Sequence, residues 1–409
     1  MRIALFHNLA SGGAKRAVYE WTRGLAAAHS VHVYTLSTAD HAFCDVRPYT
    51  PVHRVFDFHP QPLFRSPLGR LNRLQYWRDL RALTQLGRRI GAEIDRGGYD
   101  VVFAHPCRYT SIPAFLSMLR TPPVYYLHEP FGADFPPSIA RSYARRPRPL
   151  VDRLDPLLRL QRSAIERARR RSLARTRLLA NSAFTRDRMR ATYGAAALVV
   201  HCGVDVEAFQ PHADSATDNT VVSVGELAPH KGFDFLVESL ATLPAAQRPT
   251  LTLVCNVGRD DETRYVQELA ARRGVDLRLR WRLSTTELAA EYRRARLCVY
   301  APVAEGFGLV PLEAMACGIP IVAVAEGGVP ESVVDGVTGR LVPRDAQRFG
   351  EAVRALMTDA GEHRRLSANA RDYVCRDWTW DGSVRRLDTA LRTTVSDGDA
   401  ANGTRDTGR

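Results

Sequence analysis

Two glutamates flank a glycine-rich stretch in the segment EGFGLVPLEAMACGIP, which begins at Glu305. Pro311 has no backbone N–H and fits only in the first turn of a helix, so we expect a helix to begin near Gly308. Glu305 then lies on the loop before this helix, and Glu313 lies within it. The free N–H groups at the helix start can bind a diphosphate, and the carboxylates can accept hydrogen bonds from sugar hydroxyls. A loop acid followed by an exposed helix acid is the alternative.

Two further glycine turns follow apolar runs of the sequence. Gly12 and Gly13 come after the first apolar run, where a plain tight turn is an equal interpretation. The turn at residues 225–232 contains Lys231 just before an expected helix. Lys15 and Lys231 are the only lysines among 57 basic residues, and both stand beside glycines. A compact positive charge at such places favours contact with a phosphate, and chance placement is the alternative.

Apolar runs and helical segments alternate along the chain around these residues. Apolar runs bounded by turn residues occur at 3–7, 31–36, 101–105, 124–128, 178–181, 199–201, 221–225, 250–255, 297–300 and 321–325. Helical segments lie between them, at 17–28, 79–95, 234–243, 261–273, 286–294, 309–317 and 347–358. This alternation predicts an α/β protein with parallel sheets. Ligands of such sheets bind beyond the carboxyl ends of the strands, where the three glycine turns lie.

A polar stretch at 210–219 interrupts the alternation and divides the chain into two α/β units of similar size. We assign residues 1–205 to the first domain and residues 206–375 to the second. Residues 1–200 hold 31 arginines and one lysine against 14 acidic residues, whereas the remainder is mildly acidic. This asymmetry indicates different partners for the two domains. The segment 396–409 is rich in Gly, Asp and Thr and is expected to be disordered.

The composition, 45% apolar and 25% charged, is that of a globular protein. No window approaches the roughly 20 apolar residues that span a bilayer. The seven cysteines are scattered without a C-x-x-C pair, which argues against structural zinc and favours a reducing cytosol. The basic charge alone suggests nucleic acid, but no DNA- or RNA-binding motif accompanies it, so we expect no nucleic-acid partner.

The order and spacing of the motifs resemble those of the family 4 glycosyltransferases, which have the GT-B fold, and the resemblance covers nearly the whole chain. Glu305 and Glu313 match the two glutamates of the family signature, and the Gly12–Gly13 turn resembles its first glycine loop. Further similar segments are HEP at 128–130, NSAFT at 181–185, HCGVD at 201–205, GELAPHKG at 225–232, GGVPE at 327–331 and DWTW at 377–380.

The resemblance implies two Rossmann-like domains that face a cleft. The N-terminal domain would bind an acceptor and the C-terminal domain a nucleotide-sugar. A helix at 376–395 would cross back to the N-terminal domain. The implied activity is the metal-independent transfer of a sugar from the nucleotide-sugar to an acceptor hydroxyl, with retention at the anomeric carbon. We expect no cofactor and no metal site, because the only D-x-D triplet, Asp397–Asp399, lies in the tail.

The resemblance also implies roles for individual residues. Lys231 would stabilise the leaving diphosphate, Glu305 would orient the sugar, and Glu313 would hold the ribose. His128 would position the acceptor or a donor hydroxyl, although a lone histidine is more often structural. The expected catalytic residues are His128, Glu305 and Lys231. The expected donor-binding residues are Gly12, Gly13, Lys231, Glu305, Gly306, Phe307, Gly308, Leu309, Val310 and Glu313.

Two positions depart from the family pattern. Glu226 stands where the family has a diphosphate-binding arginine, and Cys202 stands where it usually has an asparagine. The charge reversal at Glu226 means that another arginine substitutes or that donor binding is altered. A non-catalytic member of the family is therefore one alternative.

The arginine-rich stretches 64–96 and 141–177 indicate what kind of acceptor the protein uses. Basic residues contribute about 1 kcal/mol each at an anionic membrane surface. We therefore expect a cytoplasmic enzyme, peripheral on the cytosolic membrane face, acting on a lipid-linked or polysaccharide acceptor in cell-envelope or glycan biosynthesis. Solvated helix faces are the plainer interpretation, and a soluble small-molecule acceptor is the alternative function. GDP-mannose and a UDP-hexose are the leading donors.

Overall fold

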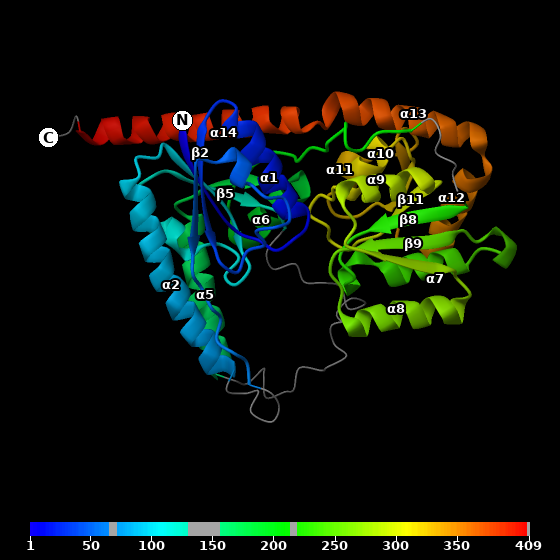
Figure 1. Cartoon of the computed structure of the whole chain (residues 1–409), viewed down its shortest axis with the longest axis horizontal. Coiled ribbons are helices and arrows are strands. Elements are labelled where there is room, and N and C mark those ends of the chain that lie inside the picture. Colours follow the sequence, from blue (N-terminus) through cyan, green and yellow to red (C-terminus); the bar gives the residue numbers. More distant parts are fainter. Residues whose placement is uncertain (65–71, 130–155, 213–218, 407–409) are drawn as a thin grey trace.

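The computed structural model describes residues 1–64, 72–129, 156–212 and 219–406, which form two parallel sheets lying side by side (Figure 1). Within these ranges, the N-terminal sheet has seven strands in the order β3-β2-β1-β4-β5-β6-β7, and the C-terminal sheet has six in the order β10-β9-β8-β11-β12-β13. The strand order reverses beside β1 and beside β8, where open α/β sheets bind ligands. The expected α/β fold with two Rossmann-like sheets is confirmed.

The strands of the N-terminal domain are β1 (Arg2–Asn8), β2 (Ser30–Leu36), β3 (Val52–Phe56), β4 (Val101–Cys107), β5 (Pro123–Leu127), β6 (Arg177–Ala180) and β7 (Ala197–Val199). Its helices are α1 (Gly13–Ala26), η1 (Arg47–Tyr49), α2 (Asn72–Arg96), η3 (Ala114–Met118), α5 (Pro156–Leu173) and α6 (Ala183–Tyr193). Six of the seven residues of β1 are buried. A central parallel strand covered on both faces requires such a continuous apolar run.

The strands of the C-terminal domain are β8 (Thr220–Val224), β9 (Thr250–Cys255), β10 (Leu277–Trp281), β11 (Leu297–Tyr300), β12 (Ile321–Val324) and β13 (Gly339–Val342). Its helices are η4 (Pro229–Lys231), α7 (Phe233–Ala241), η5 (Ala245–Gln247), α8 (Asp260–Arg273), α9 (Thr285–Arg294), α10 (Val310–Ala316), α11 (Val329–Ser332), α12 (Ala346–Thr358) and α13 (Ala360–Asp377). A capping box between Ser284 and Glu287 begins α9, because each side chain satisfies a backbone N–H at the helix start.

The last helix, α14 (Trp380–Asp406), returns to the N-terminal domain, as Figure 1 shows in red. The indole of Trp21 on α1 donates to the hydroxyl of Ser383 at 3.0 Å, and His29 Nε2 lies 2.8 Å from Asp388 Oδ1. These contacts join α14 to the N-terminal domain, and its limits differ from the 376–395 that we expected. The helix starts at 380 and continues to 406, whereas we expected a disordered tail at 396–409.

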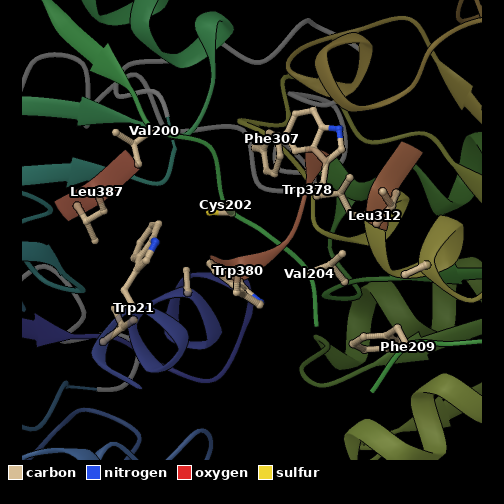
Figure 2. Close-up of a cluster of buried hydrophobic side chains, with 14 of the residues drawn as sticks. Trp21, Val200, Cys202, Val204, Phe209, Phe307, Leu312, Trp378, Trp380 and Leu387 are labelled. Atoms are coloured by element: carbon tan, nitrogen blue, oxygen red, sulfur yellow. The ribbon is translucent and has the colours of Figure 1, made fainter. Parts of the chain in front are cut away.

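Buried side chains at the crossover form one core with contributions from both domains (Figure 2). Trp21 of the N-terminal domain and Phe307 of the C-terminal domain belong to it, together with Trp378 and Trp380 at the start of the returning helix. Cys202, where the resemblance implies an asparagine, packs in this core with Sγ 3.5 Å from the Tyr126 hydroxyl. The two domains are thus joined by apolar packing where the chain passes between them.

The arginine-rich stretches lie on α2 and α5, and residues 65–71 and 141–155 of these stretches are outside the described residues. Residues 213–218 of the polar stretch and Pro130 of the HEP segment are outside them as well. Exposed arginines on the two helices are Arg78, Arg81, Arg88, Arg89, Arg96, Arg159, Arg162, Arg167, Arg170 and Arg171. In the part of the chain that the structure describes, no helix has the length and apolar character needed to cross a bilayer.

Candidate active site

Two of the residues expected to be catalytic come into direct contact. Lys231 is the last residue of η4, which follows β8, and Glu305 lies on the loop after β11. Lys231 Nζ lies 2.6 Å from Glu305 Oε2. The hydroxyl of Tyr300, at the end of β11, donates to the same oxygen at 3.2 Å. Both contacts use Oε2, so Glu305 Oε1 is without a hydrogen-bond partner among the described residues.

The pair of Lys231 and Glu305 is ionised. Burial by itself raises the pKa of Glu305, but the positive charge of Lys231 and its hydrogen bond outweigh burial, so the pKa of Glu305 is lowered. Burial lowers the pKa of Lys231, but the carboxylate of Glu305 outweighs it and the pKa of Lys231 is raised. Both side chains are therefore charged at neutral pH.

His128, the third residue expected to be catalytic, lies after β5 and reaches the same loop from the other domain. A Cβ atom on Gly306 would lie 2.7 Å from the backbone oxygen of His128, closer than side-chain atoms pack. The amide of Asn181 donates to that backbone oxygen at 2.6 Å. Only glycine fits at Gly306, because the two domains meet at its backbone.

The imidazole of His128 is held by a second histidine, His105 on β4, which we did not expect from the sequence. His105 Nδ1 lies 3.0 Å from His128 Nε2. Burial lowers the pKa of His128 to about 3, and burial, followed by the neighbouring His128, holds the pKa of His105 well below its usual range. Both rings are therefore neutral near pH 7. The signal that could have found His105 is its place at the carboxyl end of an expected strand.

The glycine-rich loop before α10 differs slightly from the expected arrangement. The helix begins at Val310 with Leu309 as its N-cap residue, two residues later than expected. Gly308 has a φ of 84°, a conformation that favours glycine. Phe307 packs against Trp378 with ring centroids 5.5 Å apart. Its side chain therefore belongs to the core, and only its backbone is available to a donor.

Glu313 is buried within α10 and already has two partners. The hydroxyl of Tyr292 donates to Oε2 at 3.0 Å, and a guanidinium nitrogen of Arg16 on α1 lies 3.6 Å from Oε1. Neither partner was expected from the sequence. A Cβ atom on Gly13 would lie 3.5 Å from Leu309 Cδ1. The glycine turn after β1 therefore lies beside the start of α10, and Arg16 links the two domains.

Of the two lysines, only Lys231 lies at this meeting of the domains with part of its side chain exposed, 17%. Gly12 is the N-cap residue of α1 and has a φ of 146°, which L side chains rarely adopt. Lys15, three residues later, is only 1% exposed. Its Nζ lies 3.4 Å from His7 Nε2, and burial lowers the pKa of Lys15. Lys15 is therefore enclosed within the N-terminal domain.

Glu226, where the resemblance implies an arginine, is exposed on the loop after β8. Its charge lies near enough to act on Lys231. Arg344 lies near Gly232, the residue after Lys231: one of its guanidinium nitrogens is 3.4 Å from where a Cβ on Gly232 would stand. Its guanidinium donates to Glu326 at 2.9 Å and to the backbone oxygens of residues 301 and 302 at 3.1 and 2.7 Å. The guanidinium of Arg344 is thus held by residues of the C-terminal domain.

Among the residues that the structure describes, no three His, Cys, Asp or Glu side chains gather in an arrangement that could hold a metal ion. Asp397 of the D-x-D triplet lies on α14 and pairs with Arg177 at 2.6 Å. Independence from metal stays a prediction.

Two family models match consecutive parts of the chain. The model described as Glycosyltransferase Family 4 matches residues 11–208, and the model described as Glycosyl transferases group 1 matches residues 205–373. D-inositol 3-phosphate glycosyltransferase 1 of Catenulispora acidiphila is 34% identical over 249 residues, which cover 55% of this chain and 59% of that protein. The D-inositol 3-phosphate glycosyltransferase of Geodermatophilus obscurus is 35% identical over 249 residues, with 55% and 54% covered. The matched region thus spans little more than half the length of these relatives.

Solved structures share the fold over nearly the whole chain. Sucrose-phosphate synthase from Thermosynechococcus elongatus superimposes with a TM-score of 0.72 at 21% identity, covering 97% of this chain and 100% of that one. HepE of Anabaena, solved in complex with UDP-glucose, has a TM-score of 0.70 at 19% identity, with 96% and 100% covered. Because the two models together account for residues 11–373 and both sheets have the topology described above, the chain belongs to the family 4 glycosyltransferases, which have the GT-B fold.

Proposed function

We propose that this protein transfers a sugar from a nucleotide-sugar to a hydroxyl of a small phosphorylated acceptor, with retention of anomeric configuration and without a metal ion. The observation that carries the proposal is the ionised contact of 2.6 Å between Lys231 and Glu305, whose charges lie near enough to act on Glu129, the residue after His128. Lys231 supplies a fixed positive charge for a leaving diphosphate, and Glu305 Oε1 supplies an acceptor for a sugar hydroxyl.

The donor binds to the C-terminal domain in this proposal. The backbone from Gly306 to Val310 lies against the diphosphate, and Glu313 receives the ribose hydroxyls. The ribose then competes with Arg16, which lies 3.6 Å from Glu313 Oε1. A UDP-hexose is the first choice of donor, because HepE of the same fold was solved with UDP-glucose, and GDP-mannose is the second.

The proposed reaction needs no carboxylate nucleophile. The bond between the anomeric carbon and the phosphate oxygen breaks, and its electrons go to the leaving diphosphate, where Lys231 and the backbone N–H groups stabilise them. The carboxylate of Glu305 offsets positive charge on the sugar. The acceptor oxygen bonds to the anomeric carbon from the same face and passes its proton to a leaving phosphate oxygen. Retaining glycosidases differ, because they form a covalent intermediate on a second carboxylate.

A soluble phosphorylated acceptor fits the relatives better than the lipid-linked or polysaccharide acceptor that we expected from the charge. The similar curated proteins are named for D-inositol 3-phosphate, and the arginine-rich N-terminal domain suits an anionic acceptor. A lipid-linked acceptor is the second candidate, favoured by the exposed arginines of α2 and α5. That candidate places the protein peripherally on an anionic cytosolic membrane face.

The test begins with the melting temperature of the protein in UDP, GDP, ADP and their common sugar conjugates. A ligand that binds only the folded state must raise this temperature. We expect one nucleotide class to do so, and its sugar conjugate to yield a glycosylated product with phosphorylated polyols, detected by mass, with its anomeric configuration read by NMR. The Glu305→Gln variant is the control for catalysis.

Two other results would overturn parts of the proposal. No shift with any nucleotide at millimolar concentration would favour a non-catalytic protein in which Glu226 has removed the diphosphate site. Transfer to lipid-linked acceptors in vesicles, with none to phosphorylated polyols, would favour the second candidate.

A further inference from the structure

The hydrogen bond between His105 and His128 determines which ring nitrogen His128 presents to a substrate. Strands β4 and β5 pair in parallel with Ala104 opposite Tyr125, so alternation puts both histidines on one face of the sheet. Their rings have centroids 5.2 Å apart, and His105 Nδ1 lies 3.0 Å from His128 Nε2. The nitrogen of His128 left for a substrate is therefore Nδ1.

Two proton arrangements are compatible with this contact. A neutral imidazole has one N–H and one bare nitrogen. If His105 donates from Nδ1, His128 accepts at Nε2 and must carry its own proton on Nδ1. If His128 donates from Nε2, it presents a bare Nδ1 to the substrate, and His105 must carry its proton on Nε2. The protonation of His105 thus sets that of His128.

The surroundings of His105 Nε2 distinguish the two arrangements. This atom is buried and has no hydrogen-bond partner among the described residues. The ring of Trp21 lies within 22° of parallel to the imidazole, so its face does not meet an N–H that lies in the imidazole plane. An orphaned buried N–H is rarer in proteins than an acceptor that goes without a donor. Nε2 is therefore the bare nitrogen of His105, and Nδ1 carries the proton.

We propose that His105 is a positioning residue that donates from Nδ1 and holds His128 with its proton on Nδ1, so that His128 meets the substrate as a hydrogen-bond donor. The substrate atom is then an oxygen lone pair, of a sugar or acceptor hydroxyl. His128 cannot act as a general base from Nδ1. The substrate rests on the proposed function, whereas the proton positions do not depend on it.

The direct test is long-range proton–nitrogen NMR of the full chain with labelled histidine and no substrate. A His128→Asn variant identifies the signals of His128. We expect the proton of His128 on Nδ1 in the wild type, and on Nε2 or shared between the nitrogens in His105→Phe. A wild-type proton on Nε2, or an unchanged Nδ1 proton in His105→Phe, would overturn the proposal.

The control is His363→Phe, which removes a half-buried histidine from α13 that contacts the backbone oxygen of Arg296 at 2.8 Å. This variant should leave the His128 signals as they are. If it moves them as His105→Phe does, the effect is general destabilisation and the assignment of His105 fails.

Turnover gives a second readout. His105→Phe should lower kcat by about tenfold with little change in the KM for the donor, and His105→Asn, whose amide can donate from the place of Nδ1, should recover most of kcat. Wild-type kcat in His105→Phe would overturn the positioning role. If the wild type transfers no sugar at all, the proposed function fails, and the NMR experiment still decides the proton positions.

Discussion

The carboxylate of Glu331 in the C-terminal domain accepts a hydrogen bond from the backbone N–H of Ala183 in the N-terminal domain at 2.8 Å. The N–H of Phe184 donates to its other oxygen at 2.9 Å. These residues begin α6, where free N–H groups and the helix dipole favour a negative charge. His201 Nε2 lies 3.1 Å from the same carboxylate. The glutamate of the GGVPE segment therefore joins the two domains.

We expect Glu331→Gln to lower the free energy of unfolding at pH 7. We also expect the free energy of unfolding of this variant to depend less on pH in acid than that of the wild type. Burial raises the pKa of Glu331, but hydrogen bonds from His201, Ala183 and Phe184 outweigh it, so the pKa is lowered. Since a free glutamate has a pKa of about 4.3, the wild-type carboxylate contributes fully to stability above that value and loses its contribution as the pH falls through the folded pKa. Chemical unfolding between pH 3 and 7 measures this. An equal acid dependence in wild type and variant would contradict it, and the exposed Glu351→Gln is the control.

His128 contributes to the stability of the fold only while its imidazole is neutral, whereas Glu331 contributes only while it is charged. Burial lowers the pKa of His128 to about 3, below the value of about 6.5 for an unfolded chain. The unfolded chain therefore binds the extra proton first, so stability is complete above the unfolded value and is lost as the pH falls toward 3. We expect unfolding free energies of His128→Phe to fall less steeply than the wild type between pH 6.5 and 4. Parallel curves would show that His128 is not neutralised by burial.

The pairing of Lys231 with Glu305 predicts different effects for single and double substitutions. Removing one partner of a buried pair leaves the other charge uncompensated, at a cost of about 3–5 kcal/mol. Lys231→Met and Glu305→Gln should each lower the melting temperature and lower turnover by about tenfold or more. The double variant should recover much of the melting temperature without recovering turnover. If the double variant recovered both melting temperature and turnover, the pair would have no role in catalysis.

Close approach of the domains at Gly306 predicts that one added methyl group is harmful there. A Cβ atom would lie 2.7 Å from the backbone oxygen of His128, which cannot move aside as a flexible side chain does. Gly306→Ala should lower kcat/KM by about tenfold or more. Gly91→Ala on α2, where the nearest atom would be 3.6 Å away, is the matched control. Equal activity of the two variants would mean that the domains do not meet at Gly306 during turnover.

Substitution of exposed arginines on α2 tests the second candidate function, transfer to a lipid-linked acceptor at an anionic membrane. Arg78, Arg81, Arg88 and Arg89 are exposed, and basic residues contribute about 1 kcal/mol each at an anionic surface. Changing all four to serine should weaken binding to phosphatidylglycerol vesicles and leave turnover of a soluble acceptor unchanged. Vesicle binding is measured by co-sedimentation at low and high salt. Unchanged binding would move the membrane contact away from α2.

The places of Glu305 and Lys231 could be predicted from the sequence, whereas their contact could not. Each follows an apolar run and stands next to a glycine, and the carboxyl ends of parallel strands share one edge of a sheet. The contact exists because β8 and β11 are neighbours, and no local pattern specifies which strands pair. Similarly, Arg16 and Tyr292 carry no motif, and they meet Glu313 only through packing of α1 and α9 around α10.

At the end of the chain, the structure has a helix where the composition indicated disorder. Gly, Asp and Thr at 396–409 indicated disorder by composition, yet α14 continues to Asp406. Helix growth adds one hydrogen bond for each residue fixed once a nucleus exists. The packed first part of α14, anchored through Ser383 and Asp388, provides that nucleus.

The two α/β domains, the glycine turns at the strand ends and the family could be predicted without a structure, because they depend on periodicity and on short motifs whose residues are neighbours in the chain. The folded chain was needed to show that Lys231 is paired, that Lys15 is enclosed, that His105 contacts His128, and that Glu331 joins the domains. Each of these depends on burial and on contacts between distant segments, which change the pKa and the hydrogen-bonding partners of a side chain without changing its type.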